Sequence, residues 1–175
     1  GRKLLVDVST AAKVNDLYFA SSDSGLSECV LSPDGTALAY VIGGELFCRS
    51  LDGSSQRLLT KSISGECDVS WSDDSRQLAF VGREENGNIL RIISSNDPER
   101  PDLSASHDFY LSEPIVSEQP LRSPLISPSQ TRIAYIRGET QLVVPDLKKL
   151  TERTIAEKNP IGEFSWSPDS RYIVY

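Results

Sequence analysis

The sequence has no methionine and a single histidine, His107. A chain without an initiator methionine is expected to be a processed or cut piece of a longer polypeptide. Its first residues, GRKLLVDVST, lack the apolar core and the small-residue cleavage site of a signal peptide. No apolar run approaches the roughly 20 residues that a membrane-spanning helix needs. We therefore predict no membrane span in this segment.

Basic residues are scarce relative to acidic ones, 18 against 25, and the net charge is −7. Since affinity for nucleic acid comes mainly from Lys and Arg side chains that neutralise phosphates, this balance excludes nucleic acid as a partner. Cysteine is also sparse, and Cys29, Cys48 and Cys67 show no CxxC spacing. A zinc site needs about four N or S ligands close together. We therefore predict buried free thiols, no metal and no cofactor.

What the sequence does contain is a repeat. Four similar segments, SPDG, SDDS, SPSQ and SPDS, begin at Ser32, Ser72, Ser127 and Ser167; the first and last steps are equal and the middle one is longer. The residues six, seven and eight places after each serine are apolar, and this pattern indicates strands buried on both faces, because a sheet with one wet face would alternate polar and apolar residues. The three columns are Leu38, Leu78, Ile133 and Ile173; Ala39, Ala79, Ala134 and Val174; and Tyr40, Phe80, Tyr135 and Tyr175. The residue just before the serine is Leu31, Trp71, Ile126 or Trp166.

The repeated segments have the composition of tight turns. Pro at the second place presets φ for a type I turn, Asp or Ser is tolerated at the third, and Gly suits the fourth. The serines are predicted to cap their own turns with side-chain hydrogen bonds. Ser129 and Gln130 replace Asp and Gly in the third turn, and we expect this replacement to weaken that turn without disturbing the rest of its unit.

Each unit contains four strand-like stretches. They are ECVLS, ALAYVI, ELFCRSL and QRLLT in the first full unit, and SPLIS, RIAYIRG, QLVVPDL and RTIA in the third. Four short antiparallel strands in a repeat of about 40 residues predict an all-β fold, a β-propeller of four-stranded antiparallel blades. The units are a partial blade (1–26), three full blades (27–65, 66–120 and 121–160) and a second partial blade (161–175). A closed ring needs more blades, so we expect these to belong to a ring of six or seven.

The second full unit is longer because of an insertion, Ser94 to Pro120, which is rich in Pro, Ser and acidic residues. Loops on a rigid scaffold often carry binding functions, but a solvated decoration is the favoured interpretation here. Serine catalysis needs a base within hydrogen-bonding reach, and the only imidazole, His107, lies inside this insertion. No GxSxG motif is present either.

Aspartates recur in the turns as Asp34, Asp74 and Asp169. A calcium ion needs about six to eight converging oxygens, and these carboxylates are expected to lie apart on separate blades. Asp73 and Asp74 are neighbours in one turn, which directs them apart. We therefore interpret the aspartates as structural and predict no catalytic, cofactor-binding or metal-binding residue in this segment; its binding residues stay undetermined.

The SPDG…LAYV and SWSPDSRYIVY stretches resemble the propeller repeats of TolB-type proteins, prolyl-oligopeptidase relatives and tricorn-type proteases. Over nearly the whole chain, the order of the blades is most similar to the propeller of bacterial tricorn-like serine peptidases. The resemblance implies a non-catalytic propeller that filters or guides peptides toward a protease domain outside this segment. No catalytic residue is carried over, because the matching domain is not in the sequence.

Two other roles stay open. The chain could be a TolB-like propeller that acts only as a scaffold for protein–protein interaction, or the propeller cap of a prolyl-oligopeptidase relative. The expected partners are peptides or a protein, and a homo-oligomer of the parent protein is compatible with all three roles. The tricorn resemblance implies a periplasmic or secreted location, with a cytoplasmic one as the alternative.

Overall fold

The computed structural model describes residues 2–7, 12–18, 26–60, 68–84, 87–95, 114–145, 151–157 and 160–175. These residues form sixteen β-strands and no helix, which confirms the all-β prediction. Accordingly, the described residues include no helix of the length and hydropathy that crossing a membrane requires.

Twelve of the strands form three four-stranded antiparallel sheets, in which each strand pairs with the next along the chain. We name these sheets blade 1, blade 2 and blade 3. Blade 1 comprises β3 (Leu26–Leu31), β4 (Ala37–Ile42), β5 (Glu45–Ser50) and β6 (Gln56–Thr60). Blade 2 comprises β7 (Val69–Trp71), β8 (Gln77–Glu84), β9 (Gly87–Ser94) and β10 (Ile115–Ser117). Blade 3 comprises β11 (Leu121–Ile126), β12 (Ile133–Arg137), β13 (Gln141–Val143) and β14 (Thr154–Glu157).

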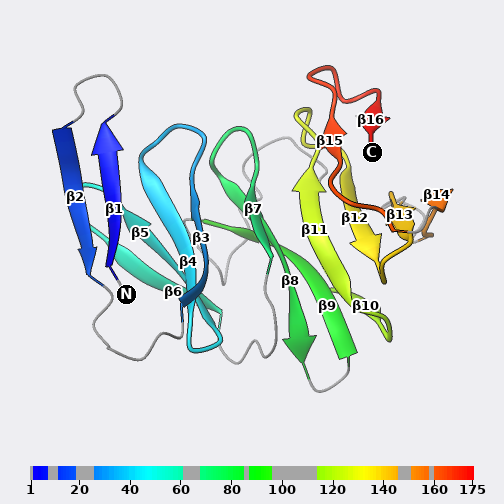
Figure 1. The fold of residues 1–175 in the computed structure, drawn as a ribbon, viewed down its shortest axis with the longest axis horizontal. Coiled ribbons are helices and arrows are strands. Elements are labelled where there is room, and N and C mark those ends of the chain that lie inside the picture. Colours follow the sequence, from blue (N-terminus) through cyan, green and yellow to red (C-terminus); the bar gives the residue numbers. More distant parts are fainter. Residues whose placement is uncertain are drawn as a thin grey trace.

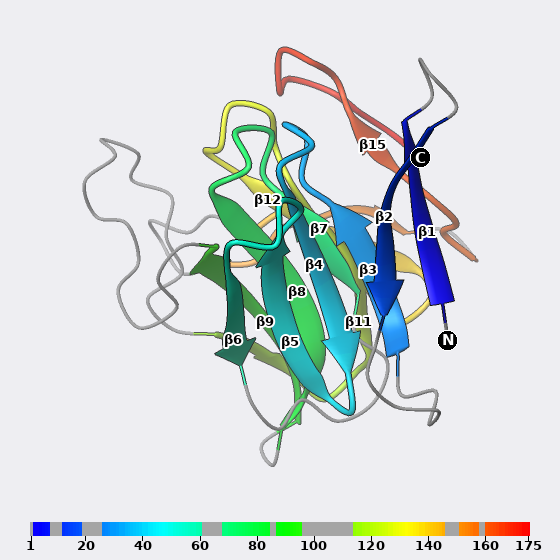
Figure 2. The ribbon, with the colours of Figure 1, turned by 90° about the vertical axis from the view of Figure 1, so that its left-hand side faces the viewer.

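Two-stranded sheets flank the blades. Before blade 1, β1 (Arg2–Asp7) pairs with β2 (Ala12–Tyr18), and after blade 3, β15 (Ser165–Trp166) pairs with β16 (Ile173–Val174). We call the β15–β16 pair and its turn, residues 165–175, the terminal hairpin. The sheets stand side by side in the order of the chain (Figure 1). In Figure 2 the strands of blade 1 run in order from β6 to β3, beyond which lies the β1–β2 pair.

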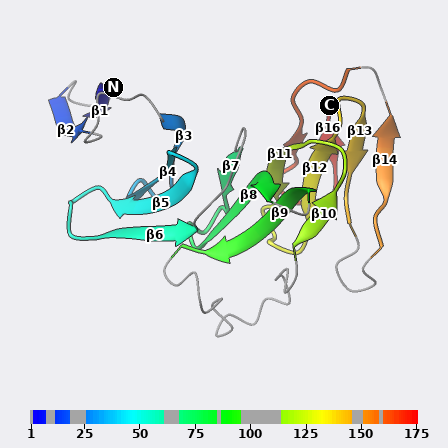
Figure 3. The same cartoon turned by 90° about the horizontal axis from the view of Figure 1, so that it is seen from below.

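The first strands of the blades line the inner side of the arrangement. From below, the sheets follow one another along an arc (Figure 3), and β7 contacts both β3 and β11. The turns between first and second strands all lie along one edge of the sheets, at the top of Figure 1. We call this edge the turn face.

Both faces of the second strand of each blade are buried, as the three apolar columns predicted. In β4, β8 and β12 every residue of these columns is at most 5% exposed. The alanine faces the following blade, where larger side chains need the space that its small side chain leaves. Ala39 shares a cluster with Leu78 and Phe80 of blade 2, and Ala79 shares one with Ile133 and Tyr135 of blade 3.

The third strand of blade 3 is shorter than predicted. The stretch QLVVPDL was expected to be a strand, but β13 ends at Val143. The N–H of Val144 still donates to the carbonyl of Arg153 at 2.9 Å. Pro145 follows it, and proline has no N–H with which to continue the ladder. The proline was visible in the sequence, so this boundary was predictable and the prediction was wrong.

Tryptophans join successive blades near the inner strands. The indole Nε1 of Trp71 donates to the carbonyl oxygen of Val30 in the preceding blade at 3.1 Å. Trp166 of the terminal hairpin makes the same contact with Leu125 of blade 3, also at 3.1 Å. We call these two contacts the indole bonds. The indole bonds show that a tryptophan just before the turn serine links its blade to the preceding one, a role that the sequence did not reveal.

The junction between blades 2 and 3 has Ile126 in the tryptophan column and uses other polar contacts. The carboxylate of Asp68 accepts a hydrogen bond from the backbone N–H of Ser123 at 2.6 Å. The hydroxyl of Ser70 donates to the carbonyl of Pro124. Each described junction therefore combines an apolar cluster with directional hydrogen bonds.

We expect Trp71→Phe to destabilise the chain by about 1 kcal/mol, because the carbonyl of Val30 loses its donor in a partly buried setting while the apolar ring is retained. The measurement is urea unfolding at neutral pH. Tyr172→Phe is the control, because Tyr172 is 64% exposed and its change should stay within about 0.5 kcal/mol. Equal stability of the two variants would contradict the role given to the indole bond.

Candidate functional site

The turn of blade 1 shows how the repeated serine and aspartate are used. The hydroxyl of Ser32 donates to Oδ1 of Asp34 at 2.6 Å and accepts the N–H of Ala37 at 2.9 Å. Oδ1 of Asp34 also accepts the N–H and the hydroxyl of Thr36, at 3.0 and 2.9 Å. The N–H of Gly35 closes the turn on the carbonyl of Ser32 at 2.9 Å. The prediction that the serine caps its own turn is confirmed.

The turns at Ser72 and Ser167 repeat this arrangement, each with a serine–aspartate bond of 2.6 Å. In the third turn, Ser129 takes the place of the aspartate, and its Oγ lies 3.3 Å from Oγ of Ser127. The backbone bond from Gln130 to Ser127 is nevertheless 2.7 Å long. The expected weakening is therefore confined to the side-chain bond, and the backbone turn closes as in the other blades.

The fourth turn residue links one blade to the next. Its φ is positive in all four turns: 71° at Gly35, 62° at Ser75, 56° at Gln130 and 60° at Ser170. Oγ of Ser75 accepts the N–H of Asp34 in the preceding turn at 3.1 Å. Oγ of Ser170 accepts the N–H of Ser129 in the same way at 2.8 Å. We call these two contacts the turn bonds, and sequence reasoning missed them because it treated the fourth position as a glycine position.

The turn face contains a hollow of about 700 Å³ between blade 1 and the turn of blade 2. Its charged lining residues are Asp34, Asp52, Asp74, Arg57 and Arg76, with serine and threonine hydroxyls among them. Asp34 and Asp74, which the sequence placed in the turns of separate blades, both line this hollow. Within the described ranges, no group of three or more His, Cys, Asp or Glu residues could hold a metal ion. The hollow is suited to polar ligands that exchange hydrogen bonds with its walls.

The carboxylates of the turns are ionised over the ordinary pH range. The Ser32 hydroxyl and then the Thr36 N–H and hydroxyl lower the pKa of Asp34 to about 2. Hydrogen bonds from Ser54 likewise lower the pKa of Asp52. Partial burial alone would raise the pKa of Asp74, but bonds from the Ser72 hydroxyl and the Arg76 N–H outweigh it and lower the pKa.

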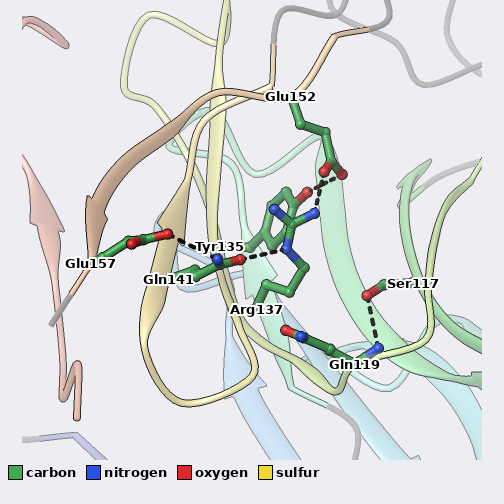
Figure 4. A network of polar contacts seen from close by, with 7 residues as sticks. All are labelled: Ser117, Gln119, Tyr135, Arg137, Gln141, Glu152 and Glu157. Carbon is green, nitrogen blue, oxygen red and sulfur yellow. Dashed lines mark hydrogen bonds and ion pairs between the residues drawn. The ribbon is translucent and has the colours of Figure 1, made fainter. Parts of the chain in front are cut away.

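A second polar cluster lies in blade 3 (Figure 4). Tyr135 is fully buried, and its hydroxyl donates to Oε1 of Glu152 at 2.7 Å. Arg137 forms an ion pair with the same carboxylate and donates from Nε to Oε1 of Gln141 at 3.0 Å. Gln141 in turn donates to Glu157 at 3.0 Å. Burial, and then the bond to Glu152, raise the pKa of Tyr135, so its phenol stays protonated and fastens the chain before β14 to β12.

Several residues singled out in the sequence lie outside the described residues, among them His107, Cys67 and positions 96–113 of the insertion. Cys29 and Cys48 are in no disulfide; Cys48 is buried and Cys29 is half-buried. Burial raises the pKa of the Cys48 thiol, which keeps it in the unreactive protonated form.

The insertion leaves blade 2 at Ser95, whose Oγ donates to the carbonyl of Arg76 at 3.0 Å. Ser95 also lines the hollow, so the insertion begins at the turn face.

Substitutions at Ser75 separate the turn bond from backbone strain. Ser75→Ala should destabilise by about 1 kcal/mol, because the N–H of Asp34 loses its acceptor while a side chain stays at positive φ. Ser75→Gly should be nearly neutral, since glycine relieves about 1 kcal/mol of left-handed strain as the bond is lost. Gly35→Ala is the matched control: a Cβ there meets nothing within 4 Å, so its expected cost of about 1 kcal/mol is purely conformational. Equal stability of the two Ser75 variants in urea unfolding would refute this division.

Acid should weaken the chain through the turn aspartates. The folded-state pKa of Asp34 is about 2, below its unfolded value. Its contribution is therefore present above about pH 4 and is lost as the pH falls toward about 2. We expect Asp34→Asn and Ser32→Ala each to flatten the pH dependence of the urea midpoint in this window. An unchanged slope in both variants would show that this hydrogen-bonded carboxylate does not control acid stability.

No protein-family model matches the sequence. Among curated proteins, dipeptidyl-peptidase 5 of Porphyromonas gingivalis is 28% identical over 135 residues, which cover 71% of this chain and 19% of that protein. Two solved structures are similar with a TM-score of 0.65: TolB of Acinetobacter baumannii and the β-propeller domain of Cps50 (Swd1) of Myceliophteria thermophila. The TolB likeness has 15% identity and covers 98% of this chain and 42% of TolB. The Cps50 likeness has 13% identity and covers 87% of this chain and 48% of that domain. The chain thus has the β-propeller fold and spans less than half of each solved chain and about a fifth of the curated relative.

Proposed function

We propose that this chain is a non-catalytic β-propeller module of a serine peptidase, and that it holds or guides peptides on their way to a catalytic domain in the rest of the polypeptide. The observation that carries the proposal is the likeness to a dipeptidyl-peptidase, of which the chain matches only 19%. A peptidase relative favours this role over that of a pure interaction scaffold.

The chemistry of the turns supports a non-catalytic role. The hydroxyls of Ser32, Ser72 and Ser167 each donate to the aspartate of their own turn at 2.6 Å. A nucleophilic serine needs instead a base that accepts its proton, and an ionised aspartate with a lowered pKa is a weak base. These serines are therefore structural, and the peptidase chemistry belongs to another part of the parent protein.

The hollow on the turn face is our candidate for the peptide contact. Its carboxylates, guanidinium groups and hydroxyls offer donors and acceptors to a peptide backbone and to polar side chains. The tricorn-like parent is the one we favour from the sequence resemblance, with the prolyl-oligopeptidase relative as the alternative. We propose a periplasmic or secreted location on the same resemblance.

The first test is made on the natural polypeptide. An antibody against residues 160–175 should recover from source cells a protein several-fold heavier than this chain, and this protein should react with a fluorophosphonate probe for active serines. The purified chain of 175 residues should neither react with the probe nor hydrolyse peptides. A natural polypeptide no heavier than this chain that ignores the probe would identify a binding scaffold instead.

The second test examines the hollow in the parent peptidase. Arg76 lines the hollow, and Arg171 occupies the corresponding position, directly after the four-residue turn, in the terminal hairpin. We expect Arg76→Gln to raise KM for peptide substrates several-fold with kcat unchanged, because it removes binding that the ground state and the transition state share. Arg171→Gln, the matched control, should leave both constants unchanged. If Arg76→Gln and Arg171→Gln changed KM and kcat to the same extent, the hollow would not be the site of peptide contact.

A further inference from the structure

The hollow on the turn face receives an arginine from a position that the other two blades use differently. This position directly follows the four-residue turn and is Thr36 in blade 1, Arg76 in blade 2 and Thr131 in blade 3. The hydroxyl of Thr36 donates to Oδ1 of Asp34 at 2.9 Å, and Oγ1 of Thr131 lies 2.8 Å from Oγ of Ser129. Both threonine side chains therefore bond to their own turns, whereas the side chain of Arg76 lines the hollow.

The backbone of Arg76 is held on both sides. Its N–H donates to Oδ1 of Asp74 at 3.1 Å. Its carbonyl accepts the N–H of Ser95 at 2.9 Å and the hydroxyl of the same residue at 3.0 Å. In the part of the chain that the structure describes, Arg76 takes part in no ion pair. The guanidinium group, a planar fork of five N–H donors, therefore extends from a fixed backbone and offers its donors to a ligand.

The three aspartates that line the hollow are engaged by the loops that carry them. Oδ1 of Asp34 and Oδ1 of Asp74 each accept the hydroxyl of their turn serine at 2.6 Å. Oδ1 of Asp52 accepts the N–H of Ser54 at 2.8 Å. These carboxylates stabilise their own loops, and Arg57 adds a second positive charge to that of Arg76 in the lining.

We propose that the hollow recognises a carboxylate of the peptide, which Arg76 binds and Arg57 attracts. A guanidinium group binds a carboxylate through two parallel N–H···O bonds, and such charge-assisted bonds are roughly twice as strong as neutral ones. The ligand is therefore a peptide with an Asp or Glu side chain or with a free C-terminus. This inference rests on the proposed contact between peptides and the hollow, and it adds the chemistry that the hollow selects.

A cationic side chain is the competing ligand, because three carboxylates line the hollow. It fits less well for two reasons. It would approach carboxylates that already accept hydrogen bonds from their own loops, and it would be repelled by both arginines. The donors of Arg76 have no such internal partner among the described residues. The engagement of the lining groups, rather than the count of their charges, therefore favours a carboxylate.

The test uses the intact natural polypeptide, treated with the fluorophosphonate probe so that it cleaves no peptide. Arg76→Thr gives blade 2 the residue type that blades 1 and 3 have at this position, so the turn should stay closed. Arg171→Thr, the matched control, makes the same change in the terminal hairpin, at a residue that does not line the hollow. Urea unfolding should give both variants the midpoint of the unchanged protein.

The readout is the dissociation constant of four short glycine-rich peptides, measured by calorimetry at neutral pH. Three have blocked termini and a central glutamate, glutamine or lysine, and the fourth has a central glutamine and a free C-terminal carboxylate. A peptide with a carboxylate should bind about tenfold more tightly than the blocked glutamine peptide. Whether the glutamate or the free C-terminus gives this gain identifies the source of the carboxylate. Arg76→Thr should abolish the gain, and Arg171→Thr should preserve it.

Three results would overturn the inference: equal binding of the blocked glutamine peptide and both carboxylate peptides, a gain that survives Arg76→Thr, or tightest binding of the lysine peptide. None of them bears on whether the parent is a peptidase, because the active serine is blocked throughout. A natural polypeptide that ignores the probe but shows the gain that depends on Arg76 would refute the peptidase role and support this inference.

Discussion

Each blade of this chain is apolar on both faces, and the rest of the structure depends on covering those faces. A sheet that packs against one neighbour buries only one of its two faces. A blade that is apolar on both faces is therefore stable only between two neighbouring blades. The fit is set by size: the alanine column of one blade meets leucine, isoleucine and aromatic side chains of the next. Because buried apolar area contributes roughly 25 cal/mol per Å², this repeated contact is the main source of stability, and it couples the blades.

Hydrophobic contact is non-directional, so it does not by itself fix how one blade is turned against another. The directional contacts lie at the turn end of the junction. The indole bonds act beside the inner strands, and the turn bonds act at the turn face. Two hydrogen bonds between the same pair of blades fix their relative orientation more closely than apolar contact alone. The junction of blades 2 and 3 has isoleucine in the tryptophan column and keeps direction through Asp68 and Ser123.

The sequence predicted what depends on local chemistry and on the period of the repeat. The four-stranded sheets and the serine caps follow from neighbours within one unit, and three consecutive apolar residues recurring in every unit predicted burial on both faces of the sheet. The turn bonds could not be predicted in this way, since Ser75 and Asp34 are 41 residues apart, and only the stacking of blades brings them together. The same reason hid the hollow, whose walls come from two blades. The sequence did contain one signal of the turn bonds, because the fourth turn position, where glycine is expected, is occupied by Ser75 and Ser170.

The way the repeat uses its polar residues limits where binding specificity can arise. The turn serines and aspartates are engaged in holding the turns, and a change at any of them alters a blade. Arg57 and Arg76 line the same hollow but do not belong to the four-residue turn pattern. If the hollow binds a ligand as proposed, substitution at such positions should change that binding while the turns stay intact. In the proposed role, in which the propeller presents peptides to a separate catalytic domain, this arrangement would allow its ligands to change without refolding, because the residues that hold the turns differ from the arginines that line the hollow.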